Sequence, residues 1–352
     1  MFTDVSFLRI LLAVLGIGFL IAFHELGHYA VARLLGMRVL RYSLGFGPRL
    51  FGFRRDGIEY QLAALPFGGF VQIAGMSSMD EAAKDDPRSY LNAPRWKRWL
   101  VLAAGPGFNY FAAFFFFFVY FAAWPSPVDQ PAFEITVVHE GPAKEAGLKS
   151  GEFITKINGV DVEAQGNFVA AIVASEGEPL TFTVLNVAGD QPVTRELLIK
   201  PAVVDGGFKV GVAVPELRAP RVGMLDTIEA SAVACVLTST RTLGALGALV
   251  QRKPGVDVGG PVAIVASMKD QIALGVRQFV LILATLSVSL GLFNLLPVPG
   301  LDGIKMVFLT IEGIARRNVN LKFQEIVNAV GVLLLLVLMA GLTVRDSFRL
   351  FG

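Results

Sequence analysis

Residues 7–35 read FLRILLAVLGIGFLIAFHELGHYAVARLL, and this stretch contains the most informative motif of the chain. It is an apolar run of membrane length, interrupted by His24, Glu25 and His28. On a helix the two histidines lie on one face, one turn apart, where both imidazoles can bind a single zinc ion. Glu25 then lies next to the metal and can act as general base on a metal-bound water. The stretch therefore predicts a catalytic metal site inside a membrane-spanning helix.

The composition of the whole chain is that of a membrane protein. Of its 352 residues 54% are hydrophobic and 17% are charged. The mean hydropathy of +0.59 is too high for an ordinary soluble domain. A net charge of +2, without a basic aromatic patch, gives a nucleic-acid partner little support. The single Cys235 excludes an internal disulfide, and no metal-ligand spacing surrounds it, so we expect it to fill space in a helix.

Four segments are long and apolar enough to cross a bilayer, which takes about 20 apolar residues in a helix. They are approximately Phe7–Leu35, Trp99–Trp124, Val276–Leu296 and Val327–Leu342. A further helical stretch, residues 224–252, carries Thr, Ser and Arg241 among its apolar residues. We expect it to lie on the outer membrane face, because a fifth span would orient the later basic loop wrongly. The predicted fold is a polytopic α-helical membrane protein with about four transmembrane helices.

Basic residues predict the orientation of these spans. Arginines and lysines gather between the first two spans and again between the last two, so we expect both loops to be cytoplasmic. The termini and the long segment from Pro125 to about Arg277 would then face outward. His24 lies about 22 Å along the helix axis from Arg9. The predicted metal pair is therefore in the cytoplasmic half of the membrane.

Residues 58–75, IEYQLAALPFGGFVQIAG, are too apolar for a solvated loop. Pro66 and the glycines after it break a helix there, and the pattern favours a β-hairpin with its turn near Pro66–Gly69. Such backbone is tolerated at membrane depth only where it is buried in protein or lines a cavity, which predicts a re-entrant hairpin near the metal. Its edge could pair with an extended substrate backbone. The alternative is a hairpin that only packs and touches no substrate.

The segment 125–204 predicts one small α+β domain on the outer side. Strand-like runs at 135–138, 153–157, 180–187 and 196–199 alternate with Gly, Asp and Asn turns. Residues 141–148 and 166–176 favour two short helices, and about 70 residues suffice for one small core. The chain then divides into 1–124, 125–204, a membrane-surface region at 205–275, and 276–352.

A catalytic zinc site needs three protein ligands and one open position for water. The remaining histidine, His139, is far along the chain, so a carboxylate near another span should supply the third ligand. Asp302 stands out, because it follows the third span within NLLPVPGLDG (294–303), where two prolines interrupt the helix. An ionisable residue at membrane depth is functional by default. The alternative is that Asp302 only caps a helix at the cytoplasmic edge.

Together these motifs resemble those of the site-2 protease family of intramembrane zinc metalloproteases, in its bacterial RseP-like branch. The resemblance covers nearly the whole chain, with HELGH at 24–28, GPGFN at 105–109 in the second span, and residues 294–303 after the third. The segment GPAKEAGLKSGE (141–152) is similar to part of the family's PDZ domain, as is ING at 157–159, and only one such domain fits. GGPV at 259–262 also resembles a family segment.

The resemblance implies a role for each matching residue. His24, His28 and Asp302 would bind one zinc ion per chain, and Glu25 would activate the water. The segment from Gly68 to Gly75 resembles the family's membrane re-entrant β-loop, which is thought to present the substrate as an added strand. The residues expected to contact substrate are Gly68, Gly69, Phe70, Val71, Asn294, Pro297 and Pro299. For Asn109 a packing role and a catalytic role both stay open.

The implied activity is that of a metalloendopeptidase of the bacterial cytoplasmic membrane, which cuts a peptide bond in or beside a transmembrane segment of another membrane protein. Anti-sigma factors and remnant signal peptides are the substrate classes that the resemblance suggests. Two other classes of function stay open. A zinc transporter also places His and Asp in spans, but these spans lack a polar path. A non-proteolytic membrane scaffold could use the PDZ-like domain, but it gives no reason for Glu25 between two histidines.

Overall fold

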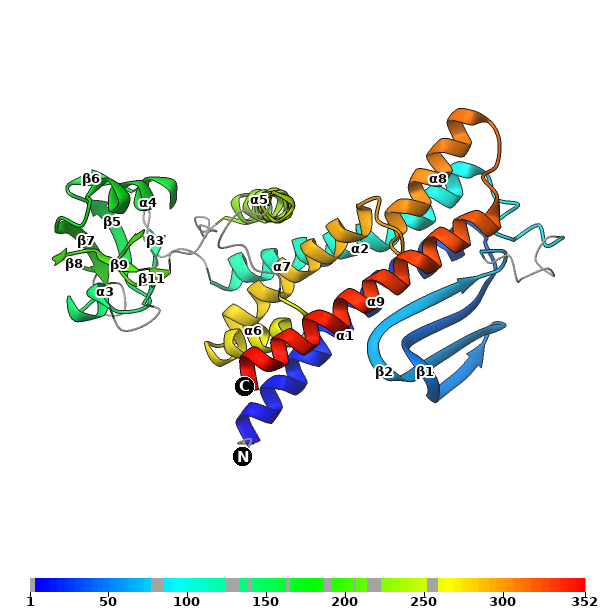
Figure 1. The fold of residues 1–352 in the computed structure, drawn as a ribbon, viewed down its shortest axis with the longest axis horizontal. Helices are drawn as coiled ribbons and strands as arrows, with labels where there is room; N and C mark the ends of the chain where they lie inside the picture. Colours follow the sequence, from blue (N-terminus) through cyan, green and yellow to red (C-terminus); the bar gives the residue numbers. More distant parts are fainter. Residues whose placement is uncertain are drawn as a thin grey trace. The chain divides into compact units, whose positions relative to one another are not determined.

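The computed structural model describes residues 4–76, 85–124, 133–137, 141–162, 165–186, 192–204, 207–213, 223–251 and 259–351. It divides into two units, one formed by residues 1–120 with 231–352 and the other by residues 121–230. Figure 1 shows the elements of both. His139 lies outside the described residues.

The first unit consists of long helices and a small sheet, with α2 and α5 crossing its boundary. Its elements are α1 (Asp4–Leu34), β1 (Val39–Arg55), β2 (Ile58–Ile73), α2 (Arg95–Ala123), α5 (Met224–Val250), α6 (Pro261–Ala273), α7 (Val276–Leu295), α8 (Asp302–Ala315) and α9 (Leu321–Phe351). Within the described residues, five helices are long and apolar enough to cross a membrane, namely α1, α2, α5, α7 and α9. They fit the expected polytopic membrane protein, whereas the expected count of four spans is not confirmed because α5 also qualifies.

Strands β1 and β2 follow α1 and precede α2 along the chain, and they pair as an antiparallel sheet. Both strands are long and bent. Residues 41–44 pair with 69–72 on one side and with 59–62 on the other, and residues 51–55 pair with 58–62. The order across the sheet is therefore 51–55, 58–62, 41–44, 69–73, which leaves the last segment at an edge.

The expected hairpin at 58–75 is wrong in its pairing and in its turn. Its two arms, 58–62 and 69–73, lie in one sheet but are separated by residues 41–44 of β1. The tight turn is at Asp56 and Gly57, whose φ angles of 51° and 77° are both left-handed. An Asp-Gly pair suits a two-residue hairpin, because such a turn needs positive φ at both positions.

Helices α1, α2 and α7 approach one another closely through glycines. A Cβ atom on Gly27 would lie 2.8 Å from the backbone carbon of Ala104 and 2.9 Å from Cγ of Phe108. On α7, a Cβ on Gly291 would lie 3.1 Å from Cβ of Asn109. Small residues are the usual means by which helix backbones approach in a membrane. This crossing brings the HELGH segment of α1 against the GPGFN segment of α2.

The loop between α7 and α8 is held by α9. The N–H of Gly300, where φ is 98°, donates to Oδ1 of Asn328 at 3.0 Å. A side chain on Gly331 would strike Pro299, so the α9 backbone lies directly against this proline. Gly303 has no room for a side chain either, because its Cβ would lie 2.6 Å from the carbonyl oxygen of Leu295. These contacts fix the loop that precedes Asp302.

The second unit is an α+β domain with one apolar core that includes Ile135, Ile154, Phe182 and Ile199. Its elements are β3 (Phe133–Glu134), β4 (Thr136–Val137), α3 (Pro142–Glu145), β5 (Phe153–Ile157), β6 (Val160–Asp161), α4 (Gln165–Ala174), β7 (Leu180–Asn186), β8 (Val193–Ile199), β9 (Ala202–Val204), β10 (Gly207–Lys209) and β11 (Val212–Ala213). The main sheet has the order β3-β5-β7-β8, with β6 paired to β5. The strand expected at 153–157 is confirmed as β5, and the two expected helices are α3 and α4.

Helix α6 receives its N-terminal cap from α9. The Oδ2 atom of Asp346 accepts hydrogen bonds from the N–H groups of Gly260 at 2.8 Å and Ala263 at 3.1 Å. Gly260 is itself the N-cap residue and has no side chain to accept them, while Pro261 needs no partner at the first helical position. Asp346 is 3% exposed, so its hydrogen bonds between α9 and α6 are shielded from water.

We expect Asp346→Ala to destabilise the helical unit by about 0.5–2 kcal/mol, the usual cost of losing an N-cap. The measurement is thermal unfolding of the purified protein in detergent, compared with Asp270→Ala, which removes an exposed carboxylate from the same helix α6. Equal unfolding temperatures for the two variants would contradict the role of Asp346 as a cap.

Candidate metal centre

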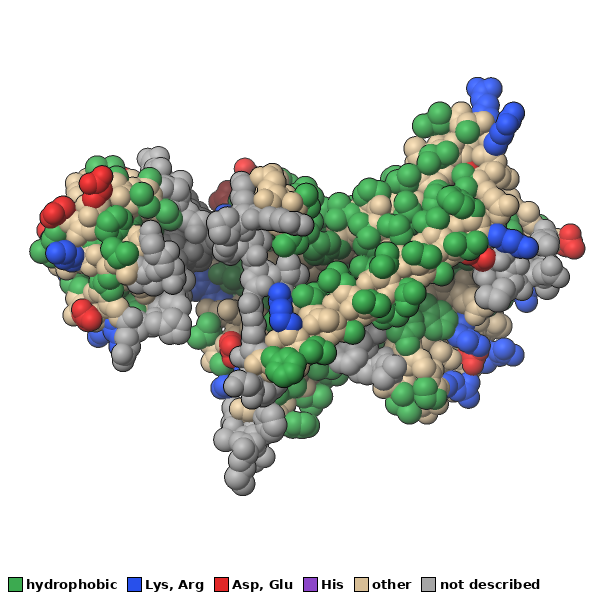
Figure 2. All heavy atoms as spheres, viewed as in Figure 1, with side chains coloured by type: hydrophobic (Ala, Val, Ile, Leu, Met, Phe, Trp, Pro, Cys, Tyr) green, Lys and Arg blue, Asp and Glu red, His purple; other side chains and the backbone are tan. Residues whose placement is uncertain are grey.

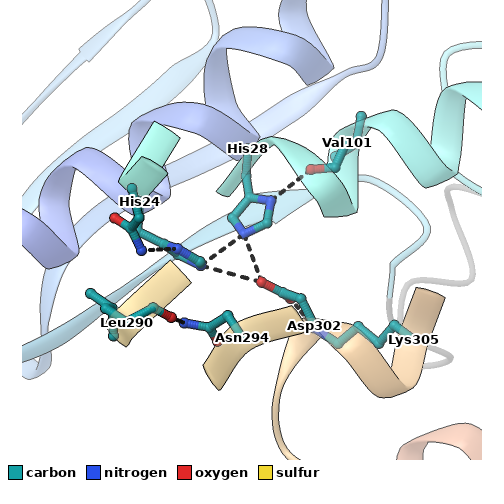
Figure 3. Close-up of polar contacts among 8 residues, drawn as sticks. His24, His28, Val101, Leu290, Asn294, Asp302 and Lys305 are labelled. Carbon is teal, nitrogen blue, oxygen red and sulfur yellow. Dashed lines mark hydrogen bonds and ion pairs between the residues drawn. The ribbon is translucent and has the colours of Figure 1, made fainter. Parts of the chain in front are cut away.

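Three side chains from two distant parts of the chain meet in the interior of the helical unit. His24 and His28 lie on α1, and Asp302 is the first residue of α8. The Oδ2 atom of Asp302 lies 3.2 Å from Nε2 of His24 and 3.0 Å from Nε2 of His28 (Figure 3). The two Nε2 atoms are 3.2 Å apart. One ligand atom from each residue thus points to a common centre, and all three residues are at most 9% exposed.

Both imidazoles are oriented by groups on α2. Nδ1 of His28 lies 2.7 Å from the carbonyl oxygen of Val101, to which it donates its hydrogen. Nδ1 of His24 lies 3.0 Å from the amide of Asn109, whose Oδ1 is buried and has no hydrogen-bond partner among the described residues. A metal-binding Nε2 leaves the hydrogen on Nδ1, and rotating the Asn109 amide by 180° turns Oδ1 to accept it. In each histidine the hydrogen bond at Nδ1 then fixes the tautomer and leaves Nε2 free to bind a metal.

Gly105 leaves the space that this arrangement needs. A Cβ atom there would lie 2.7 Å from Nε2 of His24 and would also strike Nε2 of His28. The backbone of α2 therefore passes directly beside the two ring nitrogens. This close approach is the physical reason for Gly105, the first of the two glycines in the GPGFN segment.

Glu25 lies beside the edge of the sheet. A Cβ atom on Gly69 would be 3.1 Å from Cγ of Glu25 and 2.8 Å from the carbonyl oxygen of Ser43, so β2 passes close to the Glu25 side chain at a position where a glycine fits best. The sheet is also fixed to α1 by Tyr42, whose hydroxyl donates to the carbonyl oxygen of Ala22 at 2.9 Å. None of the described residues donates a hydrogen bond to the Glu25 carboxylate, which leaves its lone pairs available to a proton.

The remaining expected residues divide into two groups. Gly68, Phe70 and Val71 lie on β2 next to Gly69, at the edge beside Glu25. Asn294, by contrast, turns its amide back onto its own helix, where Nδ2 donates to the carbonyl oxygen of Leu290 at 2.9 Å. Pro297 is exposed, and Pro299 packs on Gly331 of α9. The structure therefore places Gly69 beside Glu25 and gives Pro299 a packing contact.

The donor set suits zinc. Two imidazole nitrogens and one carboxylate oxygen make a three-residue set of the kind found in catalytic zinc sites, where a fourth position stays open. The alternative for Asp302, that it only caps a helix, does not fit its position, because Leu301 is the N-cap and Asp302 turns its carboxylate to the histidines. The expected site residues do not include Lys305, whose Nζ lies 3.3 Å from Oδ1 of Asp302.

We expect Asn109→Leu to weaken zinc binding roughly 10–100-fold, the usual loss when a partner of a ligating histidine is removed. The measurement is competition for zinc with a chromophoric chelator in detergent. Asn109→Asp, which keeps an oxygen to accept from Nδ1 of His24, serves as the matched control. An unchanged affinity in Asn109→Leu would show that Asn109 only packs.

Comparisons with known proteins agree with this geometry. The model of peptidase family M50 matches residues 12–338. A Clostridium perfringens protein named "putative zinc metalloprotease" is 32% identical over 96% of this chain and 98% of its own length. Relatives with the same description occur in Mesorhizobium japonicum, at 32% identity over 92% of this chain and 94% of the relative, and in Rickettsia conorii, at 30% over 96% and 98%. The chain belongs to peptidase family M50, the family of the site-2 proteases.

Proposed function

We propose that this chain is a zinc-dependent metalloendopeptidase that cuts peptide bonds in or near transmembrane segments of other membrane proteins. Membership of a peptidase family and the names of the relatives support a membrane zinc metallopeptidase. The observation that carries the finer proposal is the position of the cluster. His24, His28 and Asp302 meet where two candidate membrane helices and the start of α8 come together.

In this proposal His24, His28 and Asp302 hold the metal and Glu25 moves the proton. Zinc, when bound, supplies a Lewis acid that lowers the pKa of a water ligand to about 7 and polarises a carbonyl. Glu25 follows His24 directly on α1, and its carboxylate has no competing donor among the described residues. It can therefore take a proton from the attacking water and later pass it to the leaving amine nitrogen.

The edge of the sheet provides a place for the substrate backbone. A peptide bond inside a helix is hidden, so the substrate must unwind before it is cut, and unpaired N–H and C=O groups at membrane depth are costly. Residues 69–73 form the edge of the sheet, and Gly69 lies against Glu25. A substrate segment added as a strand beside Gly68, Gly69, Phe70 and Val71 would satisfy its backbone there and extend past the carboxylate. We also propose that Asn294 and the exposed Pro297 contact this substrate segment.

Further parts of the proposal rest on sequence and charge. We assign the expected residues 125–204, together with β10 and β11, to a PDZ-like domain on the outer side, because the described elements surround one core that includes Val210 and the turn motifs resemble that family. Figure 2 shows lysine and arginine side chains at the far end of α8 and around the sheet, besides others near the opposite end of the helical unit. The basic residues around α8 and the sheet favour a cytoplasmic position for that end. Anti-sigma factors and remnant signal peptides are the proposed substrates, in a bacterial cytoplasmic membrane.

A zinc transporter or a scaffold accounts for less of the site. Transport needs a metal site with a route to each side, but it needs neither a carboxylate without a donor nor a strand edge beside it. A scaffold needs no metal cluster. The close approach of Gly69 to Glu25 therefore favours hydrolysis over both alternatives.

We expect Glu25→Gln to lower the cleavage rate at least 10²-fold, because general acid–base catalysis contributes about 10²–10⁴-fold. Bound zinc should be unchanged, since Glu25 is not one of the three ligands. Cleavage of a transmembrane substrate in reconstituted vesicles and zinc content are measured together, with the exposed Glu229→Gln as control. Cleavage by Glu25→Gln at the wild-type rate would exclude the proposed base.

Strand addition predicts a two-residue period of contact. In a Cys235→Ser, Glu25→Gln background, Phe70→Cys should cross-link to single cysteines placed along the substrate at alternate positions, because successive side chains of a strand point to opposite faces. Phe53→Cys, on the opposite edge segment of the sheet, is the control and should give little product. Cross-links at every third or fourth substrate position would indicate a bound helix and contradict strand addition.

A further inference from the structure

The two oxygens of Asp302 have different partners. Oδ2 faces the Nε2 atoms of His24 and His28, whereas Oδ1 lies 3.3 Å from Nζ of Lys305, three residues further along α8 (Figure 3). The Asp302 side chain is only 11% exposed, so water cannot readily replace either contact. The carboxylate is thus held from both sides, with one oxygen toward the centre and the other toward the lysine.

The lysine completes a pattern shared by all three residues of the cluster. Behind His24 lies the amide of Asn109, behind His28 the carbonyl of Val101, and behind Asp302 the ammonium of Lys305. Groups in such positions orient metal ligands and are as much a part of a metal site as the ligands themselves. The torsion that turns a carboxylate has broad minima, so Asp302 needs an external contact to keep one oxygen directed inward.

Lys305 can make this contact without losing all its water. Its side chain is 35% exposed and lines a cavity of about 630 Å³, together with Arg98 and Glu312. Burying an ammonium completely is costly, whereas here one side binds the carboxylate and the other side faces the cavity. The cavity therefore permits a charged residue to stand next to the cluster.

We propose that Lys305 is a positioning residue of the metal site, which holds Oδ1 of Asp302 so that Oδ2 alone is directed to the metal. This inference rests on the proposed function, because it takes Asp302 as a zinc ligand. The positive charge of Lys305 would by itself have the opposite effect on zinc affinity. An ammonium repels a nearby cation, so a lysine that acted only by charge would weaken zinc binding, and its removal would strengthen it.

The test compares Lys305→Met, Lys305→Arg and the matched control Lys322→Met in the full-length protein in detergent. Zinc affinity is measured by chelator competition, and the visible spectrum of the Co²⁺-loaded protein reports the number of ligand atoms. We expect Lys305→Met to lose roughly 10–100-fold in zinc affinity. Its Co²⁺ absorption should fall as Oδ1 becomes free to coordinate. Lys305→Arg should restore most of the affinity and the wild-type spectrum, and Lys322→Met should match wild type.

A second comparison shows whether Lys305 acts through Asp302. In an Asp302→Asn background, Lys305→Met should cause little further loss of zinc affinity, because the effects of residues in one network are not additive. A full additional loss, an affinity that rises in Lys305→Met, or an unchanged affinity and Co²⁺ spectrum would each overturn the inference. Failure of the proposed function is distinguishable, since it appears as wild-type protein that binds no zinc or as cleavage by Glu25→Gln.

Discussion

Helices α1 and α2 lie close enough at Gly27 and Gly105 for the backbone of one to touch the side chains of the other. This close approach places the carbonyl of Val101 and the amide of Asn109 behind the two histidines. A wider separation would leave two polar rings in an apolar interior without partners, at a cost of about 1–3 kcal/mol for each lost contact. Packing and chemistry are therefore set by the same two glycines.

The sequence predicted the chemistry of the cluster better than its surroundings. Two histidines four residues apart on a helix lie on the same face. The proline-interrupted segment after the third span contains few carboxylates, so the third ligand could also be predicted. The groups behind the ligands were not predictable in this way, because Val101 contributes a backbone carbonyl that any residue type could supply. Lys305 is a different case. It lies three residues after Asp302 on a helix, a spacing at which opposite charges meet, so this contact is predictable from the sequence.

The sheet shows where reading by local pattern fails. Residues 66–69 contain a proline and two glycines, a pattern that predicts the turn of a hairpin, yet the arms on either side pair with β1. The pairing of β1 could not be read from alternation, because Gly45, Gly47 and Pro48 interrupt it and both glycines adopt φ of 88°. The Asp56-Gly57 turn was the available clue, since that dipeptide between apolar runs is the strongest short-range signal of a hairpin. The order of the other strand segments depends on pairing between residues far apart in the sequence, which a local pattern does not show.

The contacts of α9 have a consequence for the order of events during synthesis. Pro299, Gly300 and α6 are held by residues of α9, namely Gly331, Asn328 and Asp346. The ribosome makes this helix after the histidines, after Asp302 and after the loop between α7 and α8. A nascent chain that has already inserted His24 and His28 therefore still lacks the support that fixes its carboxylate. The candidate metal centre therefore gains the contacts that fix the loop before Asp302 only when α9 has been made.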